Sequence, residues 1–122
     1  MTNYGKQKQQ TFARFRLSQE DANKIATGQF TIYDFINNAF SFSQTNKDLA
    51  AKVLEILNAR PTTFMNLCRA TNAKKSTLYL LMLALERSGF VEKRKTGEFC
   101  LSDGFARALD GYSNWWRAWV KN

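Results

Sequence analysis

The chain has 122 residues, of which 44% are hydrophobic and 14% aromatic, enough to bury the core of one modest domain. A formal net charge of +8 favours a polyanionic partner, either nucleic acid or an acidic membrane surface. The sequence has no histidine, and Cys68 and Cys100 are far apart, which excludes an ordinary zinc site; we expect two buried free thiols.

The positive charge is concentrated in two parts of the chain. Residues 1–19 contain four basic residues and no acidic one, and residues 60–95 contain eight basic and two acidic residues. Residues 20–59 carry a net charge of −2, and residues 96–122 are balanced. Charge segregated in this way indicates a nucleic-acid footprint rather than general solvation of the surface.

Several classes of protein lack support in the sequence. No apolar run approaches the roughly 18 residues of a membrane span, and the polar N-terminus lacks the apolar core of a signal peptide. There is no metalloprotease motif, phosphate loop or recognisable carboxylate pair, so we expect no enzyme, no metal site and no cofactor. We expect a cytoplasmic, nucleoid-associated protein.

Residues 1–17 are predicted to form a basic arm, because the first ten are polar and cannot contribute to a core. Residues 12–17 alternate between apolar and other side chains, which predicts a short strand with Arg14 and Arg16 on a cationic, DNA-facing side. A ribbon-helix-helix, with these arginines on a paired strand, is the alternative, although the helix that follows is short for that motif.

Residues 18–44 are predicted to form N-terminal helices. Three hydroxyl residues stand three positions before an aspartate, the spacing of a capping box, and so predict three helix starts. The pairs are Ser18 with Asp21, Thr31 with Asp34, and Thr45 with Asp48.

The segment after Thr31 is too apolar to be solvated alone. Phe35 lies on its apolar helical face and Phe40 lies beside that face. This face either packs within its own domain or forms a dimer interface, since aromatic side chains dominate both kinds of burial.

Residues 45–102 have the pattern of a winged helix-turn-helix. A helix over roughly 46–59 ends before Pro61, and Thr62 or Thr63 caps a short second helix. The turn follows at Asn72, a residue that tolerates the left-handed conformation. The next helix begins near Lys74.

This next helix is the candidate reading helix. Its buried stripe is predicted to be Leu78, Leu81, Met82 and Leu85. The opposite side then carries Ser76, Tyr79, Leu80, Leu83 and Arg87. Lys74 and Lys75 stand at the N-terminal end, where the helix dipole favours phosphate.

A hairpin is predicted after Ser88 and Gly89, which end the reading helix. Its cationic tip contains Lys93, Arg94 and Lys95, and its returning strand places Phe99 and Leu101 on one face. Such a wing suits the DNA backbone or the minor groove.

Residues 49–102 resemble the N-terminal winged helix-turn-helix of IclR-type transcriptional regulators and, more loosely, of MarR-type proteins. The motif KSTLYLLMLALERSGFVEK is the most similar part. The resemblance implies a mainly α fold with a small β-hairpin and extra N- and C-terminal helices. It places Lys75, Ser76, Thr77 and Tyr79 at recognition-helix positions and Leu80 where the family usually has a polar or basic contact. The family's effector-binding domain has no counterpart in the sequence, so no small-molecule effector domain is expected.

Residues 103–122 are predicted to form an aromatic helical segment capped by Ser102 and interrupted at Gly111. An aromatic stripe at helical spacing indicates a surface that docks on a second copy or on the N-terminal helices; base stacking on single strands is the alternative. We favour dimerisation through this stripe, which comprises Tyr112, Trp115, Trp116 and Trp119.

The sequence therefore predicts a small, sequence-specific double-stranded-DNA-binding homodimer, a transcriptional regulator or repressor. One alternative is a DNA-binding accessory of plasmid or phage replication, partition or conjugation. Another is a protein-interaction module that docks a partner on Leu80 and Leu83.

Overall fold

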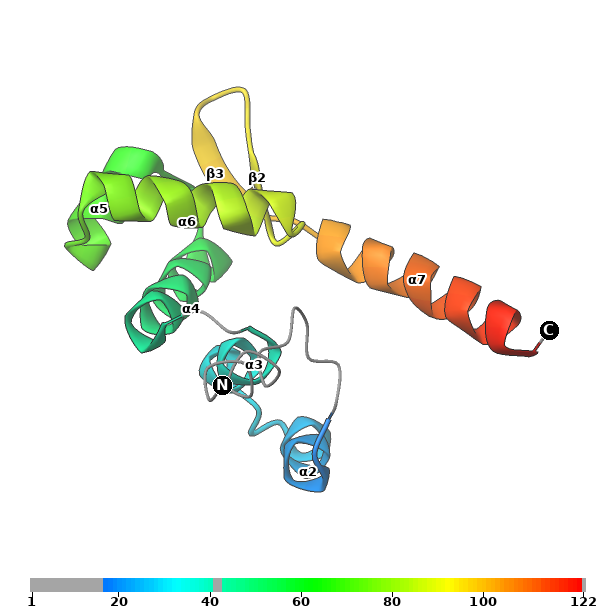
Figure 1. Ribbon diagram of the computed structural model, residues 1–122. Helices are drawn as coiled ribbons and strands as arrows, with labels where there is room; N and C mark the ends of the chain where they lie inside the picture. Colours follow the sequence, from blue (N-terminus) through cyan, green and yellow to red (C-terminus); the bar gives the residue numbers. More distant parts are fainter. Residues whose placement is uncertain (1–16, 41–42, 122) are drawn as a thin grey trace, which may run out of the picture. The chain divides into compact units, whose positions relative to one another are not determined.

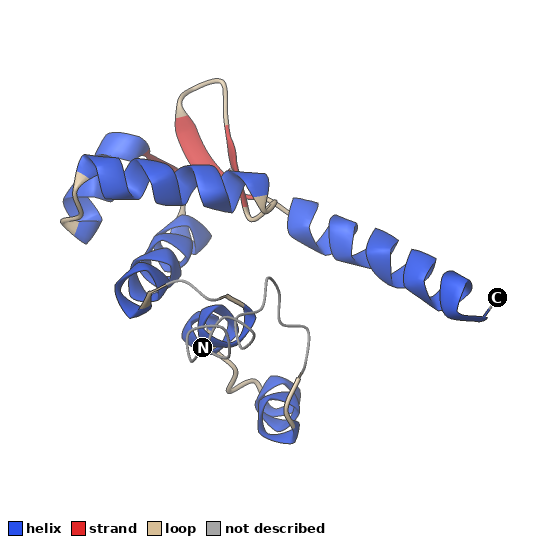
Figure 2. Cartoon of the chain, viewed as in Figure 1, coloured by secondary structure: helices blue, strands red, loops and turns tan. Residues whose placement is uncertain are grey.

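The computed structural model describes residues 17–40 and 43–121 (Figures 1 and 2). Arg14 and Arg16, with the strand predicted around them, lie outside the described residues. The described helices are α2 (Gln19–Thr27), α3 (Ile32–Ala39), α4 (Gln44–Ala59), α5 (Phe64–Thr71), α6 (Lys75–Arg87) and α7 (Gly104–Lys121). The described strands are β1 (Thr62–Thr63), β2 (Val91–Lys93) and β3 (Glu98–Leu101). The fold is thus mainly helical with a small antiparallel sheet, as predicted.

The chain consists of two compact units, Met1–Lys52 and Val53–Asn122, with α4 extending across the division. In the first unit, two of the predicted helix starts are confirmed. The Asp21 N–H donates to the Ser18 hydroxyl at 3.1 Å. The Asp34 N–H donates to the Thr31 hydroxyl at 3.2 Å, and the Thr31 N–H donates to Asp34 Oδ2 at 3.0 Å, which completes the capping box.

The third predicted start was wrong by two residues. The helix begins at Gln44, and the Asn46 N–H donates to the Ser43 hydroxyl at 3.3 Å. Thr45 therefore lies inside the first turn. Ser43 and Thr45 both carry a hydroxyl group that could cap the helix, and Ser43 does so. The spacing of Thr45 to Asp48 therefore indicated the wrong cap.

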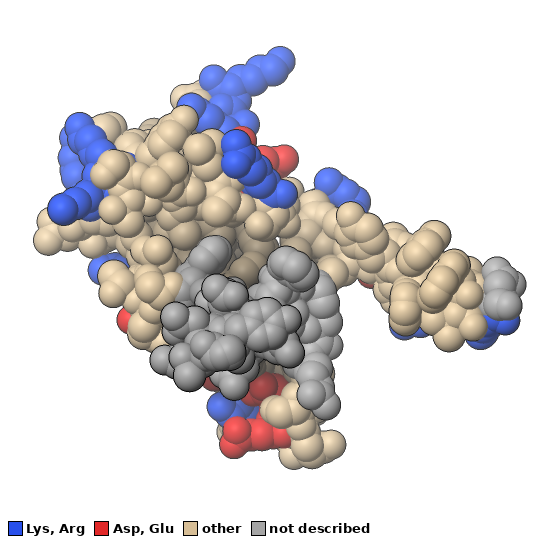
Figure 3. Space-filling model, viewed as in Figure 1, with Lys and Arg blue, Asp and Glu red and all other residues tan. Residues whose placement is uncertain are grey.

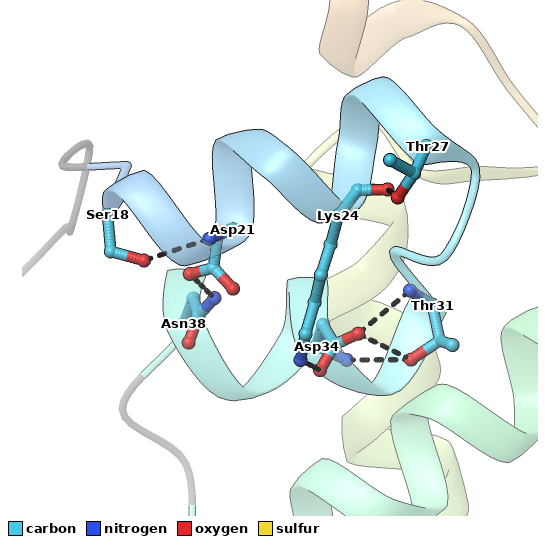
Figure 4. A network of polar contacts seen from close by, with 7 residues as sticks. All are labelled: Ser18, Asp21, Lys24, Thr27, Thr31, Asp34 and Asn38. Carbon is cyan, nitrogen blue, oxygen red and sulfur yellow. Dashed lines mark hydrogen bonds and ion pairs between the residues drawn. The ribbon is translucent and has the colours of Figure 1, made fainter.

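Polar contacts also join α2 to α3 (Figure 4). The Asn38 amide donates to Asp21 Oδ2 at 2.6 Å, and Lys24 Nζ lies 3.6 Å from Asp34 Oδ1. The Thr31 backbone N–H, and then the Thr31 hydroxyl and Lys24, hold the pKa of Asp34 below its usual range against the opposing effect of desolvation.

The apolar residues of α3 divide into one buried and several half-buried side chains. Ile36 is fully buried. Phe35 and Phe40 are half-buried and contact each other edge to face, with ring centroids 5.9 Å apart. Their use as a dimer interface stays a prediction.

In the second unit, α5 and α6 form the predicted helix-turn-helix. Thr63 caps α5 by accepting from the Asn66 N–H at 3.2 Å. Asn72 ends α5 in the left-handed conformation with φ 56°, which confirms the predicted turn. All four residues of the predicted α6 stripe are buried, and Cys68 and Cys100 are buried free thiols.

The wing is a three-stranded sheet in the order β1-β3-β2. The sequence predicted only the hairpin, because the two residues of β1 are too few to show a strand period. β1 pairs with Phe99 and Glu98 alone, so the sheet is two strands wide at Leu101. Phe99 and Leu101 are two residues apart in β3 and so lie on one face as predicted, but Phe99 is buried whereas Leu101 is 40% exposed.

Gly89 brings the end of α6 against the start of α7. Its φ of 84° favours glycine, and a Cβ there would lie 2.6 Å from the Phe105 backbone nitrogen. The Phe105 N–H donates to the Gly89 carbonyl at 3.0 Å, and the rings of Phe90 and Phe105 lie 4.3 Å apart. A side chain at position 89 would break this contact.

The predicted interruption at Gly111 was wrong, because α7 is one unbroken helix of 18 residues (Figure 1). A single internal glycine weakens a helix by only about 1 kcal/mol relative to alanine, which is too little to break it. Ser102 supports the start as predicted, since its hydroxyl accepts from the Gly104 N–H at 3.1 Å. No helix within the described residues is long and apolar enough to cross a membrane.

Candidate nucleic-acid interface

The N-terminal turn of α6 gathers the predicted contact residues. Lys74 is the N-cap residue and makes no side-chain capping hydrogen bond. The first N–H groups of a helix have no intrahelical acceptor, so they remain available to an anion such as phosphate. Lys74, Lys75 and Ser76 are exposed, and Thr77 is half-buried.

The next turn of α6 is exposed but apolar. Tyr79 is 57% exposed and Leu80 is 66% exposed. Because residues four apart lie on one side of a helix, Tyr79 follows Lys75 and Leu80 follows Ser76 along this surface. We call these four residues the reading face.

A cleft of about 320 Å³ lies between α6 and the sheet. It brings together Tyr79 of α6 and Lys93 of β2, two residues predicted to contact DNA from separate elements. The remaining lining residues are Phe64, Met82, Leu83, Glu86 and Phe99.

The cleft separates the two leucines that the sequence paired. Leu83 is half-buried in the cleft wall, whereas Leu80 is exposed on the reading face. The sequence also missed Phe64 and Glu86 as parts of this site. Glu86 stands seven residues after Tyr79, a spacing that returns to the same side of a helix and could have indicated it.

The wing supplies the second group of cations. Arg94 and Lys95 lie in the exposed turn between β2 and β3, as predicted. Lys93 instead lies within β2, opposite Phe99, with its Nζ 5.8 Å from the Phe99 ring centroid. This cation–π contact ties part of the Lys93 side chain to the wing itself.

Figure 3 shows Lys and Arg side chains over the wing at the top and over the junction of α5 and α6 at the left. Tyr79 follows Lys75 along α6 and shares the cleft with Lys93 of the wing, so cationic residues stand on two sides of Tyr79. Double-stranded nucleic acid has charged phosphates on both sides of a groove and less polar base edges between them. A helix surface with cationic groups at its border suits such a partner.

The predicted dimerisation residues of α7 form a continuous aromatic surface. Tyr112, Trp115, Trp116 and Trp119 are 56–71% exposed. The rings of Trp115 and Trp119 are stacked with centroids 5.9 Å apart, and those of Trp116 and Trp119 with centroids 5.4 Å apart. We call these four residues the aromatic stripe.

Comparison with protein-family models matches residues 48–95 to the IclR helix-turn-helix domain. Searches among curated proteins and among solved structures found no significant match. The matched stretch runs from within α4, through α5 and α6, to the turn of the wing. This domain type binds DNA in transcription regulators and is not a catalytic domain. Residues 48–95 of this chain are therefore similar to the IclR helix-turn-helix domain, and with β3 they form a winged helix-turn-helix fold.

Proposed function

We propose that the protein is a sequence-specific double-stranded-DNA-binding homodimer that regulates transcription, acting as a repressor by occupying its operator at the nucleoid. The observation that carries this proposal is the position of the IclR-type match: it covers the exposed start of α6 and the cationic turn of the wing. These are the two elements with which winged domains contact DNA.

Each group of residues has a distinct role in the proposal. Lys75, Ser76, Thr77 and Tyr79 enter the major groove, while Lys74 meets a phosphate at the helix N-terminus. The phosphates or the minor groove are held by the wing residues Lys93, Arg94 and Lys95 and by the arm residues Arg14 and Arg16.

The exposed area of the aromatic stripe supports dimerisation through α7. Aromatic side chains of this size bury roughly 150–250 Å² each, so four that are more than half exposed offer on the order of 500 Å² per protomer. Pairing two copies would bury about 1,000 Å², the lower limit for a specific interface. No side chain of α7, which is described up to Lys121, is buried within its own chain.

Small residues beside the stripe favour a second α7 as its occupant. Gly111 and Ala118 lie seven residues apart along one edge of the stripe. No atom lies within 4 Å of a Cβ built on Gly111, so a partner helix can approach there closely. The charged residues Arg117 and Lys121 lie on the opposite side and would stay in water.

A two-fold dimer would present two copies of α6 to half-sites about one DNA turn apart, roughly 34–36 Å. We include Phe35 and Phe40 as a second subunit contact, because both keep part of their surface exposed.

Selection of duplexes from a random pool tests the proposal. The full chain should enrich an inverted repeat, which would demonstrate sequence specificity and two-fold symmetry together. Failure to enrich any duplex at low salt would overturn the proposal. Mapping bound sites in cells separates regulation, with sites at promoters, from an accessory role, with repeats at a replication or transfer origin.

A further inference from the structure

The apolar half of the reading face, Tyr79 and Leu80, is not explained by phosphate binding. In α6, which is described throughout, Leu80 is the most exposed large apolar side chain at 66%. From Ser76 to Leu83 the helix carries no arginine, lysine, amide or carboxylate side chain. The part of α6 deepest in a major groove therefore lacks the groups that pair with polar base edges.

The major groove offers only one apolar feature, the 5-methyl group of thymine. Guanine is read by arginine or lysine, adenine by asparagine or glutamine, and cytosine by a carboxylate. A leucine placed against any of those edges removes water from donors or acceptors without replacing their hydrogen bonds, which is unfavourable. A leucine against a thymine methyl group buries apolar surface on both sides.

The surroundings of Leu80 agree with this assignment. Leu83 is withdrawn into the cleft wall with Phe64, so it does not share the exposed surface of Leu80. Lys74 lies at the N-terminus of the same helix, where it can hold a phosphate and set the depth of the helix.

We propose that Leu80, together with the ring of Tyr79, selects thymine in each half-site by contact with its 5-methyl group. This inference rests on the proposed function and specifies which base its reading helix prefers. It predicts a T·A pair at one or two fixed positions of the operator half-site.

Substitution of deoxyuridine for thymidine tests the contact, because it removes the methyl group and leaves the Watson–Crick edge unchanged. The duplex is the one enriched from the random pool, and each thymine is replaced in turn. At one or two positions per half-site, affinity should fall about four-fold per methyl group, the value expected for one buried carbon.

Leu80→Ala should reduce the preference for thymine over deoxyuridine duplexes, and Leu80→Ala combined with Tyr79→Ala should bind both duplexes equally, because both side chains that contact the methyl group are then gone. Ile25→Ala is the matched control, since Ile25 is 50% exposed on α2 and should leave the methyl dependence intact. Leu80→Gln provides a second variant, and reselection with it should replace the preferred thymine by adenine.

The outcomes separate this inference from the function on which it rests. If the full chain enriches a duplex but every deoxyuridine substitution leaves its affinity unchanged, the thymine contact is overturned and DNA recognition stands. If Leu80→Ala binds the selected duplex normally but fails to retain a protein that co-purifies with the parent chain, Leu80 docks a protein instead. If no duplex is enriched, the proposed function itself fails.

Discussion

Removal of the wing cations should flatten the salt dependence of DNA binding. The exposed residues Arg94 and Lys95 lie in the turn, where both can release counterions from phosphates. Each phosphate contact contributes about 0.9 to the slope of log affinity against log salt, so the double substitution Arg94→Ala with Lys95→Ala should reduce the slope by about 1.8. Between 50 and 200 mM salt, this difference corresponds to about a twelve-fold change in relative affinity.

Lys93 should contribute less than its neighbours. Its ammonium group lies 5.8 Å from the centroid of the Phe99 ring, so part of its charge is engaged within the protein. Adding Lys93→Ala to the double variant should therefore lower the slope by less than a further 0.9.

Fluorescence anisotropy with the selected duplex, repeated over a salt series, measures these slopes. The double variant Arg117→Ala with Lys121→Ala is the control, because it removes the same charge from α7 and should leave the slope close to that of the parent. An unchanged slope in the wing variant would refute the assignment of Arg94 and Lys95 to phosphates. An equal fall in both variants would mean that net charge, not the wing, determines the salt dependence.

Three further predictions follow from the two units. Replacing Trp115 and Trp119 together by alanine should convert the dimer to a monomer in sedimentation equilibrium, and a variant that remains dimeric would exclude the aromatic stripe. The pKa of Asp34 is lowered in the folded chain, so ionised Asp34 stabilises the α2–α3 pair at every pH above the ordinary carboxyl pKa. This stabilisation is lost as the pH falls through the lowered pKa. In the parent chain, hydrogen-exchange protection of α3 should fall as the pH is lowered, and Asp34→Asn should make this fall smaller. The same pH dependence in both proteins would contradict the role of Asp34. Leu67→Ala should cost about 2–5 kcal/mol in urea unfolding, because Leu67 is fully buried, whereas Leu80→Ala should cost less than about 0.5 kcal/mol. Equal costs would contradict the burial assigned to the two leucines.

Local signals predicted three helix starts and the turn of the helix-turn-helix. The caps at Ser18, Thr31 and Thr63 depend on a hydrogen bond within three residues, and the turn depends on the conformational tolerance of Asn72. Such features are complete within a few residues of sequence. The buried stripe of α6 could also be predicted from the sequence, because the helical periodicity extends through all 13 residues of this helix.

The errors arose where competing local choices or distant contacts decide the structure. Ser43 rather than Thr45 caps α4, because either hydroxyl could serve and the sequence does not rank them. The glycine signal at Gly111 was overestimated, since the flanking helix-forming residues outweigh it. Leu80 and Leu83 could not be distinguished from the pattern of α6, because only packing shows that Leu83 lies in a cleft wall shared with α5 and the sheet. The sequence thus indicated candidate contact residues on α6 and in the wing, but it did not predict the cleft that brings Tyr79 and Lys93 together.

The contact at Gly89 has a consequence for how an operator sequence could diverge. The end of the reading helix and the start of α7 meet through the Gly89 carbonyl and the paired rings of Phe90 and Phe105. If two copies pair through α7, this junction determines the separation of their reading helices, while the side chains of α6 determine the bases read. Changes at position 89 would then alter the length of the spacer between half-sites and leave the half-site sequence unchanged. Spacing and base preference could accordingly evolve through separate substitutions.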